Sequence, residues 1–123
     1  MIYGDIINSS YDELREKFPR FQSLSPEQKV VAMYNGNDIE SYSNNSDIIV
    51  HYDILNSDRP ILVVERVPDS EFESAEQLEE FINETNKLIK DYVVAYDVVE
   101  DKEYVDISLT RNGLYENIIK QGV

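Results

Sequence analysis

Apolar and polar residues follow a helical period over 74–91, the most regular stretch of the chain. One mainly apolar stripe repeats at steps of three and four residues, which is the spacing of one face of an α-helix. Its members are Leu78, Phe81, Ile82, Thr85, Leu88, Ile89 and Tyr92. Ser74 followed by Gln77 forms the capping-box pattern at which helices begin. We therefore predict one long helix here, with that stripe packed on a core.

Two pairs of strand-like segments flank this helix. Before it, 47–55 alternates in period two, and a turn-forming Asn-Ser-Asp leads into 59–67. After it, 93–99 and 104–110 form a second pair around a polar turn. Period-two alternation joined by short turns predicts two β-hairpins. The run 61–64 is apolar at every position, which predicts a central strand covered on both faces.

Two short helices are predicted near the N-terminus. Ser10 with Glu13 forms a capping box, and Pro19 ends the helix that it opens. A second helix is predicted over 25–36, with proline at its first position and glycine at its end. We expect both helices to pack on the face of the sheet away from the long helix. Three segments complete the pattern: 1–9, an edge strand or a helical turn; 37–46, a polar loop; and 114–120, a last helical turn or two.

This order of elements predicts the α+β class: an antiparallel sheet of two hairpins, one long amphipathic helix between them and two short N-terminal helices. The 123 residues have the length of one domain, so we expect a single domain over 1–123. Three of the nine tyrosines lie on apolar faces and are expected in the core: Tyr52, Tyr92 and Tyr96. The chain has no cysteine, no long apolar run and no basic, apolar leader, so we expect a soluble cytoplasmic protein.

Acidic charge is the strongest feature of the composition. Lys and Arg total 11 against 25 Asp and Glu, a formal net charge of −14. Such an excess repels nucleic acid and anionic membranes and favours a basic partner. Between residues 67 and 86 there are seven carboxylates and no Lys or Arg. Glu76, Glu80 and Glu84 are four residues apart, about 6 Å along a helix axis, which is close to the spacing of phosphates in a nucleic-acid strand.

Two structural explanations compete with partner binding. A solvated acidic surface provides solubility, and Glu76 and Glu79 also stabilise a helix start through its dipole. The predicted partner-binding residues are the acids of the helix, of its approach and of the later hairpin: Asp69, Glu71, Glu73, Glu76, Glu79, Glu80, Glu84, Asp97, Asp101 and Asp106.

Catalytic and metal-binding patterns are missing from the sequence. His51 is the only histidine; it lies beside Asp53 on a predicted strand, where a serine could complete a triad, but no glycine-flanked serine elbow occurs. The four glycines form no phosphate-binding loop. The acidic clusters 69–73 and 100–103 lack the spacing of a calcium loop. We expect no catalytic residue, metal site or cofactor, and hence no enzyme.

These observations favour an acidic inhibitor that occupies a basic, nucleic-acid-binding site on a partner protein. Phages and mobile elements use small acidic proteins in this way against CRISPR, restriction and DNA-repair enzymes, an analogy of size and charge only. One alternative is an immunity protein or antitoxin that neutralises a basic nuclease toxin. Another, from a different class, is a small enzyme or ligand-binding domain with a pocket between helix and sheet.

Overall fold

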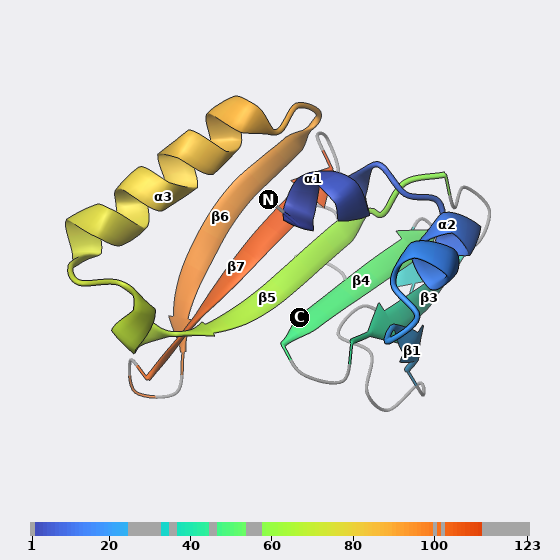
Figure 1. Ribbon diagram of the computed structural model, residues 1–123, viewed down its shortest axis with the longest axis horizontal. Helices are drawn as coiled ribbons and strands as arrows, with labels where there is room; N and C mark the ends of the chain where they lie inside the picture. Colours follow the sequence, from blue (N-terminus) through green and yellow to red (C-terminus); the bar gives the residue numbers. More distant parts are fainter. Residues whose placement is uncertain are drawn as a thin grey trace.

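An antiparallel sheet with three helices forms the framework of the protein (Figure 1). This computed structural model describes residues 2–24, 33–34, 37–44, 47–53, 58–99, 101 and 103–111. The helices are α1 (Ile2–Ile7), α2 (Tyr11–Lys17) and α3 (Ala75–Leu88), with a 3-10 turn, η2 (Asp69–Glu71), ahead of α3. The strands are β1 (Gln22–Ser23), β2 (Met33–Tyr34), β3 (Asn37–Ser43), β4 (Ile48–Asp53), β5 (Leu62–Pro68), β6 (Tyr92–Val99) and β7 (Tyr104–Arg111). The predicted α+β fold class is confirmed.

The strand order places the predicted hairpins side by side. Neighbouring strands follow the order β1-β3-β4-β5-β7-β6, and β2 pairs with β3 as well. Both β5 and β6 are antiparallel to β7, so they run parallel to each other, and α3 is the crossover between them. Because β7 enters between them, β6 lies at the edge of the sheet beside α3.

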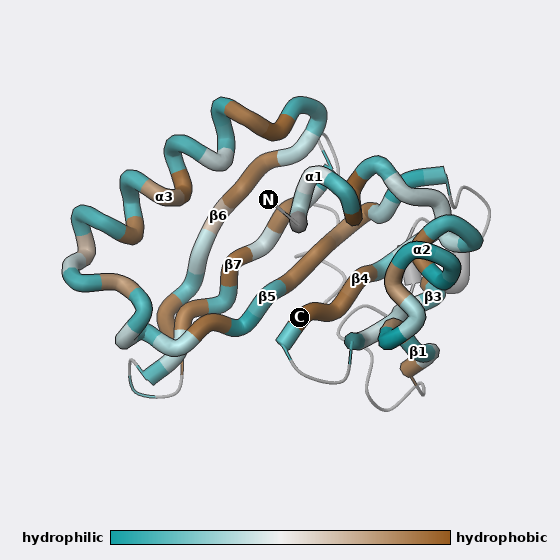
Figure 2. Tube along the Cα trace, in the orientation of Figure 1, coloured by the Kyte–Doolittle hydropathy of each residue, from teal (hydrophilic) through white to brown (hydrophobic). Residues whose placement is uncertain are grey.

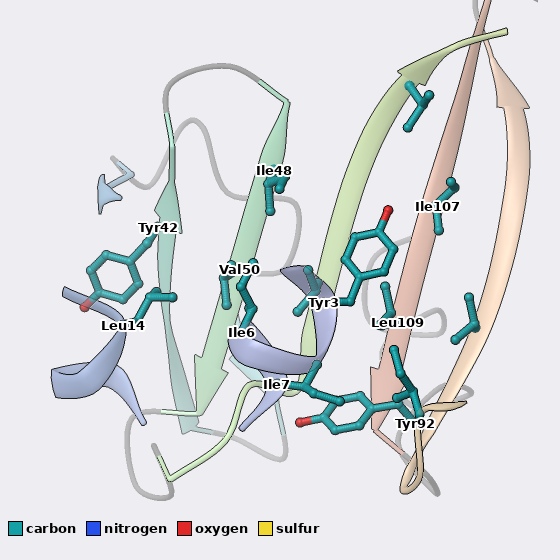
Figure 3. Close-up of a cluster of buried hydrophobic side chains, with 14 of the residues drawn as sticks. Tyr3, Ile6, Ile7, Leu14, Tyr42, Ile48, Val50, Tyr92, Ile107 and Leu109 are labelled. Carbon is teal, nitrogen blue, oxygen red and sulfur yellow. The ribbon is translucent and has the colours of Figure 1, made fainter. Parts of the chain in front are cut away.

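The three helices pack on one face of the sheet. Tyr3, Ile6 and Ile7 of α1 belong to the same buried cluster as Val50 and Leu109 of the sheet (Figure 3). Leu14 of α2 and the buried stripe of α3 belong to it too. The prediction that the two N-terminal helices cover the far face is therefore wrong for the helix that Ser10 opens, α2. A helix is about 10 Å wide and covers roughly two neighbouring strands. Because α3 covers only part of this face, α1 and α2 cover the half formed by β3–β5.

The predicted polar loop over 37–46 is largely a strand. Residues 37–43 form β3, paired in register with β4, and its Ile39 and Tyr42 are buried. Strand preference depends on neighbours more than on the local sequence, and here β4 supplies them. The prediction of a helix over 25–36 is wrong at its C-terminal end, because Met33–Tyr34 is strand β2. The rest of that helix, and the predicted turn over 114–120, lie outside the described residues.

Local capping explains where the helices begin. At α2 both bonds of the capping box are present, between Ser10 and Glu13. At α3 the Ser74 hydroxyl accepts from the Gln77 backbone N–H at 3.1 Å. Apolar and polar positions alternate along α3 (Figure 2). The helix ends at Leu88, which is 71 % exposed. The prediction that Leu88 belongs to the buried stripe is therefore wrong.

None of the helices in the described part of the chain is long and apolar enough to cross a bilayer.

Candidate functional site

The acids of α3 lie on the side of the helix that faces away from the sheet. Leu78, Ile82 and Thr85 are buried against the core, while every glutamate of the helix is exposed. One cation pairs with them in the described residues: Lys87 Nζ lies 3.4 Å from Glu84 Oε1, and both side chains are more than half exposed. Such a surface pair contributes little to stability. We use the name acidic face for the exposed acids of η2, α3 and their connection: Asp69, Glu71, Glu73, Glu76, Glu79, Glu80 and Glu84.

The fold also brings a second acidic segment to one end of this surface. The Asp69 backbone N–H donates to the Glu103 carbonyl at 2.9 Å, which joins η2 to the β6–β7 turn. Asp101 in that turn has φ 55°, a left-handed conformation that Asp tolerates better than most residues. Its place in the turn therefore has a structural reason. Within the described ranges, no three His, Asp or Glu side chains converge in a way that could hold a metal ion.

Asp97 and Asp106 lie on the other face of the sheet. They are cross-strand partners, and they alternate with the β6 and β7 residues that face the helices. Asp106 accepts from Arg66 at 2.8 and 3.1 Å, a bidentate pair that offsets the repulsion from Asp97. The predicted set therefore divides: the turn that contains Asp101 adjoins the η2 end of the acidic face, and Asp97 and Asp106 lie on the opposite face of the sheet.

His51 forms a buried pair with a serine on the second face of the sheet. Its Nδ1 lies 2.7 Å from Ser41 Oγ, and the two residues are opposite each other on β4 and β3. The exposed fraction of each residue is 1 % or less. A substrate has no access to this hydroxyl in the folded protein, and the pair links two strands, which fits the structural interpretation of His51.

A second polar pair, partly buried, connects α1 to the sheet. The Tyr3 hydroxyl donates to Glu65 Oε1 on β5. Burial raises the pKa of Glu65, with the charges of Asp47 and Glu71 acting in the same direction and the hydrogen bond from Tyr3 acting against it. Burial, followed by the bond to Glu65, raises the pKa of Tyr3. The pair attaches α1 to the sheet and carries an energetic cost near neutral pH.

An open groove lies beside the acidic face, between helix and sheet, where only the ligand-binding alternative placed a pocket. α3 and β6 are close at the C-terminal end of the helix and diverge toward its N-terminus (Figure 1). A cavity of about 330 Å³ lies between the start of α3, the segment that leads into it and the later part of β6. We use the name edge groove for this hollow and its lining residues: Asp69, Phe72, Glu73, Ser74, Ala75, Leu78, Tyr96 and Val98. Tyr96 is 37 % exposed and Val98 42 %, so the expectation that Tyr96 is a core residue is wrong.

A larger hollow of about 410 Å³ lies between α2 and the β1–β3 edge. Tyr11, Arg15, Phe21 and Tyr42 contribute to its lining. The Arg15 guanidinium lies 5.6 Å from the Tyr11 ring centre and donates to the Tyr11 hydroxyl at 3.2 Å. This cation is thus already used by its neighbour on the same helix, which leaves the hollow with little to fix a small ligand.

Comparison with protein families, with characterised proteins and with solved structures gives no match to this chain.

Proposed function

We propose that the protein is a non-enzymatic binding protein whose acidic face occupies a basic surface of a partner protein. The observation that carries the proposal is the concentration of exposed carboxylates on one side of α3 and η2, with one described cation among them. Like charges at a spacing of four residues destabilise a helix by about 0.2–0.5 kcal/mol per pair. A basic partner removes that repulsion when it binds, so the same residues favour the complex.

The acidic face is also held rigidly, which favours binding. α3 is fixed to the sheet by Leu78 and Ile82, and its first turn is capped by Ser74. Little side-chain or backbone order has to be gained at the helix when a partner docks. Glu76, Glu80 and Glu84 present carboxylates at intervals of about 6 Å. A protein surface that binds the phosphates of a nucleic acid is the basic surface that best fits such a row, and occupation of that surface inhibits its owner.

Two partner classes use this same surface. The first class is a nucleic-acid enzyme of a defence system, of the kind that phages and mobile elements inhibit. The second class is a basic nuclease toxin, which an immunity protein or antitoxin neutralises. Both proposals require the acidic face, and they differ in the partner alone. An enzymatic function requires an accessible reactive group, which the buried Ser41–His51 pair does not supply.

The test compares two charge reversals with the same spacing and the same change in net charge. Glu76→Lys with Glu80→Lys alters the acidic face, and Asp12→Lys with Glu16→Lys alters the exposed side of α2. Each variant is immobilised and used to capture proteins from an extract of the source cells, and captured proteins are identified by mass spectrometry. We expect a basic nucleic-acid-binding protein to be retained by the wild type and the α2 variant, and to be reduced more than tenfold with the α3 variant.

Salt and competing nucleic acid complete the test. Retention of the partner should weaken steeply between 50 and 300 mM NaCl, because exposed charges are screened over about 10 Å at 0.1 M salt. A DNA or RNA ligand of the partner should displace it. If both double variants lose capture equally, the acidic residues act through the net charge of the whole surface and not as a binding site, and the proposal is then wrong.

A further inference from the structure

The outer edge of β6 is partly occupied by a side chain of α3. Asn86 Nδ2 donates to the Val94 carbonyl at 3.0 Å, and Asn86 Oδ1 accepts from the Val94 N–H at 2.9 Å. The amide thus pairs with Val94 as a neighbouring strand would. Among the described strands β6 pairs with β7 alone, so these two bonds show which way the Val94 backbone points: outward, away from the sheet.

The same direction applies to Tyr96 and Val98. In an antiparallel pair the N–H and C=O of one residue point the same way, and every second residue repeats the direction. The register of β6 on β7 is continuous over 92–99, so no bulge changes it. The N–H and C=O of Tyr96 and Val98 therefore point outward, and no hydrogen bond within the described residues reaches them.

This open edge adjoins the edge groove. The side chains of Tyr96 and Val98 form one wall of that groove, and Phe72, Ala75 and Leu78 belong to the rest of its lining. An added strand places alternate side chains on the helix-covered face of the sheet, where the groove receives them. β6 carries no Lys or Pro, the residues with which proteins usually protect an exposed edge.

The charges around the edge select the occupant. Asp69 and Glu73 line the groove, and Asp101 and Glu103 are exposed in the turn at its end. Glu79 lies seven residues before Asn86, which places it within about 20° of the same flank of α3. A strand that carries Lys or Arg complements these acids. A second copy of this chain, with its net charge of −14, does not.

We propose that the β6 edge at Tyr96 and Val98 is a docking site for an extended, basic segment of the partner protein. The segment adds to the sheet as a strand, places alternate apolar side chains in the edge groove, and directs its cations to the surrounding acids. This inference rests on the proposed function, because it assigns a second contact to the same basic partner. Asn86 limits the site to the part of β6 beyond Val94.

The test uses a synthetic probe, the capped octapeptide in which Lys and Val alternate. Two control peptides carry Glu in place of Lys, or the same Lys and Val in two separate blocks. Binding is measured by fluorescence anisotropy at 0.1 M NaCl, and amide exchange by NMR. We expect the Lys-Val peptide to bind, to slow exchange at the Tyr96 and Val98 amides at least tenfold, and to bind at least tenfold more tightly than either control.

Val98→Pro is the decisive variant. Proline removes an N–H that points away from β7, so the ladder of the folded protein keeps its bonds, and an edge position tolerates the ring. We expect it to weaken the peptide about tenfold, the loss of one or two hydrogen bonds at the edge. Val98→Ser is the second variant, which removes the groove wall with an intact backbone. Val93→Ser is the control, because Val93 is 43 % exposed on the same strand but on the opposite face, and it should bind normally.

Results of four kinds, on the place of binding, the charge preference, binding itself and a second copy, overturn the inference. Equal binding by wild type, Val98→Pro and Val98→Ser, or no slowing of exchange at Tyr96 and Val98, places any bound peptide elsewhere. Preference for the Glu-Val peptide contradicts the charge argument, and no binding of the Lys-Val peptide contradicts the docking site itself. A dimer at 0.1 M NaCl that Val98→Pro dissociates assigns the edge to a second copy. If the peptide binds as expected but no basic partner is captured by the acidic face, the edge stands and the proposed function fails.

Discussion

Asn86 provides the sharpest test of how the edge of β6 is built. Asn86→Ala removes two hydrogen bonds to the Val94 backbone, at 2.9 and 3.0 Å. Each contributes about 0.5–1.5 kcal/mol net, so their loss costs about 1–3 kcal/mol. Alanine is the better helix former by about 0.5 kcal/mol, which offsets part of this cost. The net decrease in the free energy of unfolding is then about 0.5–2.5 kcal/mol.

Asn83→Ala is the matched control, because it makes the same change one turn earlier on an exposed position of α3. It gains the same helix propensity without losing bonds to β6, so it should stabilise the protein by about 0.5 kcal/mol. Urea unfolding followed by circular dichroism measures both variants, and NMR hydrogen exchange should report faster exchange at the Val94 amide in Asn86→Ala. If the two variants differ by less than about 0.3 kcal/mol, the Asn86 amide does not cap the edge, and the outward direction of the Tyr96 and Val98 backbone groups is contradicted.

Three further results follow from the core and the buried polar groups. Ile82→Ala should cost about 2–5 kcal/mol in urea unfolding, and Phe81→Ala less than a full core truncation, because Phe81 is only partly buried; the reverse order contradicts the packing of α3. Burial raises the pKa of Glu65 in the folded protein above its ordinary value of 4.5, so its contribution to stability should be complete below pH 4.5 and be lost as the pH rises from there through the raised pKa. Glu65→Gln should flatten this fall in a pH series of urea melts. His51→Ala should cost about 1–3 kcal/mol by leaving Ser41 without this bond, yet leave Lys-Val peptide binding unchanged; lost binding in a folded variant contradicts a structural role.

The sequence predicts elements whose signals are local. α3 is predictable because Ser74 with Gln77 caps its start and its apolar residues repeat in the helical period. The β6–β7 and β4–β5 hairpins are predictable from alternation. β3 is not, since its residues 37–43 are mostly polar and become a strand through pairing with β4. Such pairing is a non-local property that no window of sequence contains.

The candidate surfaces have the same limit. That Asp97 and Asp106 are exposed to some degree is predictable from their alternation with apolar residues. That they face away from α3 depends on which side of the sheet the helix covers. Alternation likewise assigns Tyr96 to the helix-covered face, but the divergence of α3 from β6, which leaves it 37 % exposed, is decided by the tertiary structure.

The acidic charge and the open edge have a joint consequence for self-association. A long apolar edge strand with exposed N–H and C=O groups tends to pair with another copy, and β6 carries no lysine or proline against this. The net charge of −14, with Asp69, Glu73, Asp101 and Glu103 beside this edge, opposes that pairing by repulsion. Screening shortens the range of the repulsion from about 10 Å at 0.1 M salt to about 3 Å at 1 M. We therefore expect sedimentation velocity to detect association of the wild type at 1 M NaCl and none at 0.1 M, with Val98→Pro monomeric at both. If the wild type is monomeric at 1 M NaCl, or if Val98→Pro associates equally, then charge repulsion is not what prevents pairing at this edge.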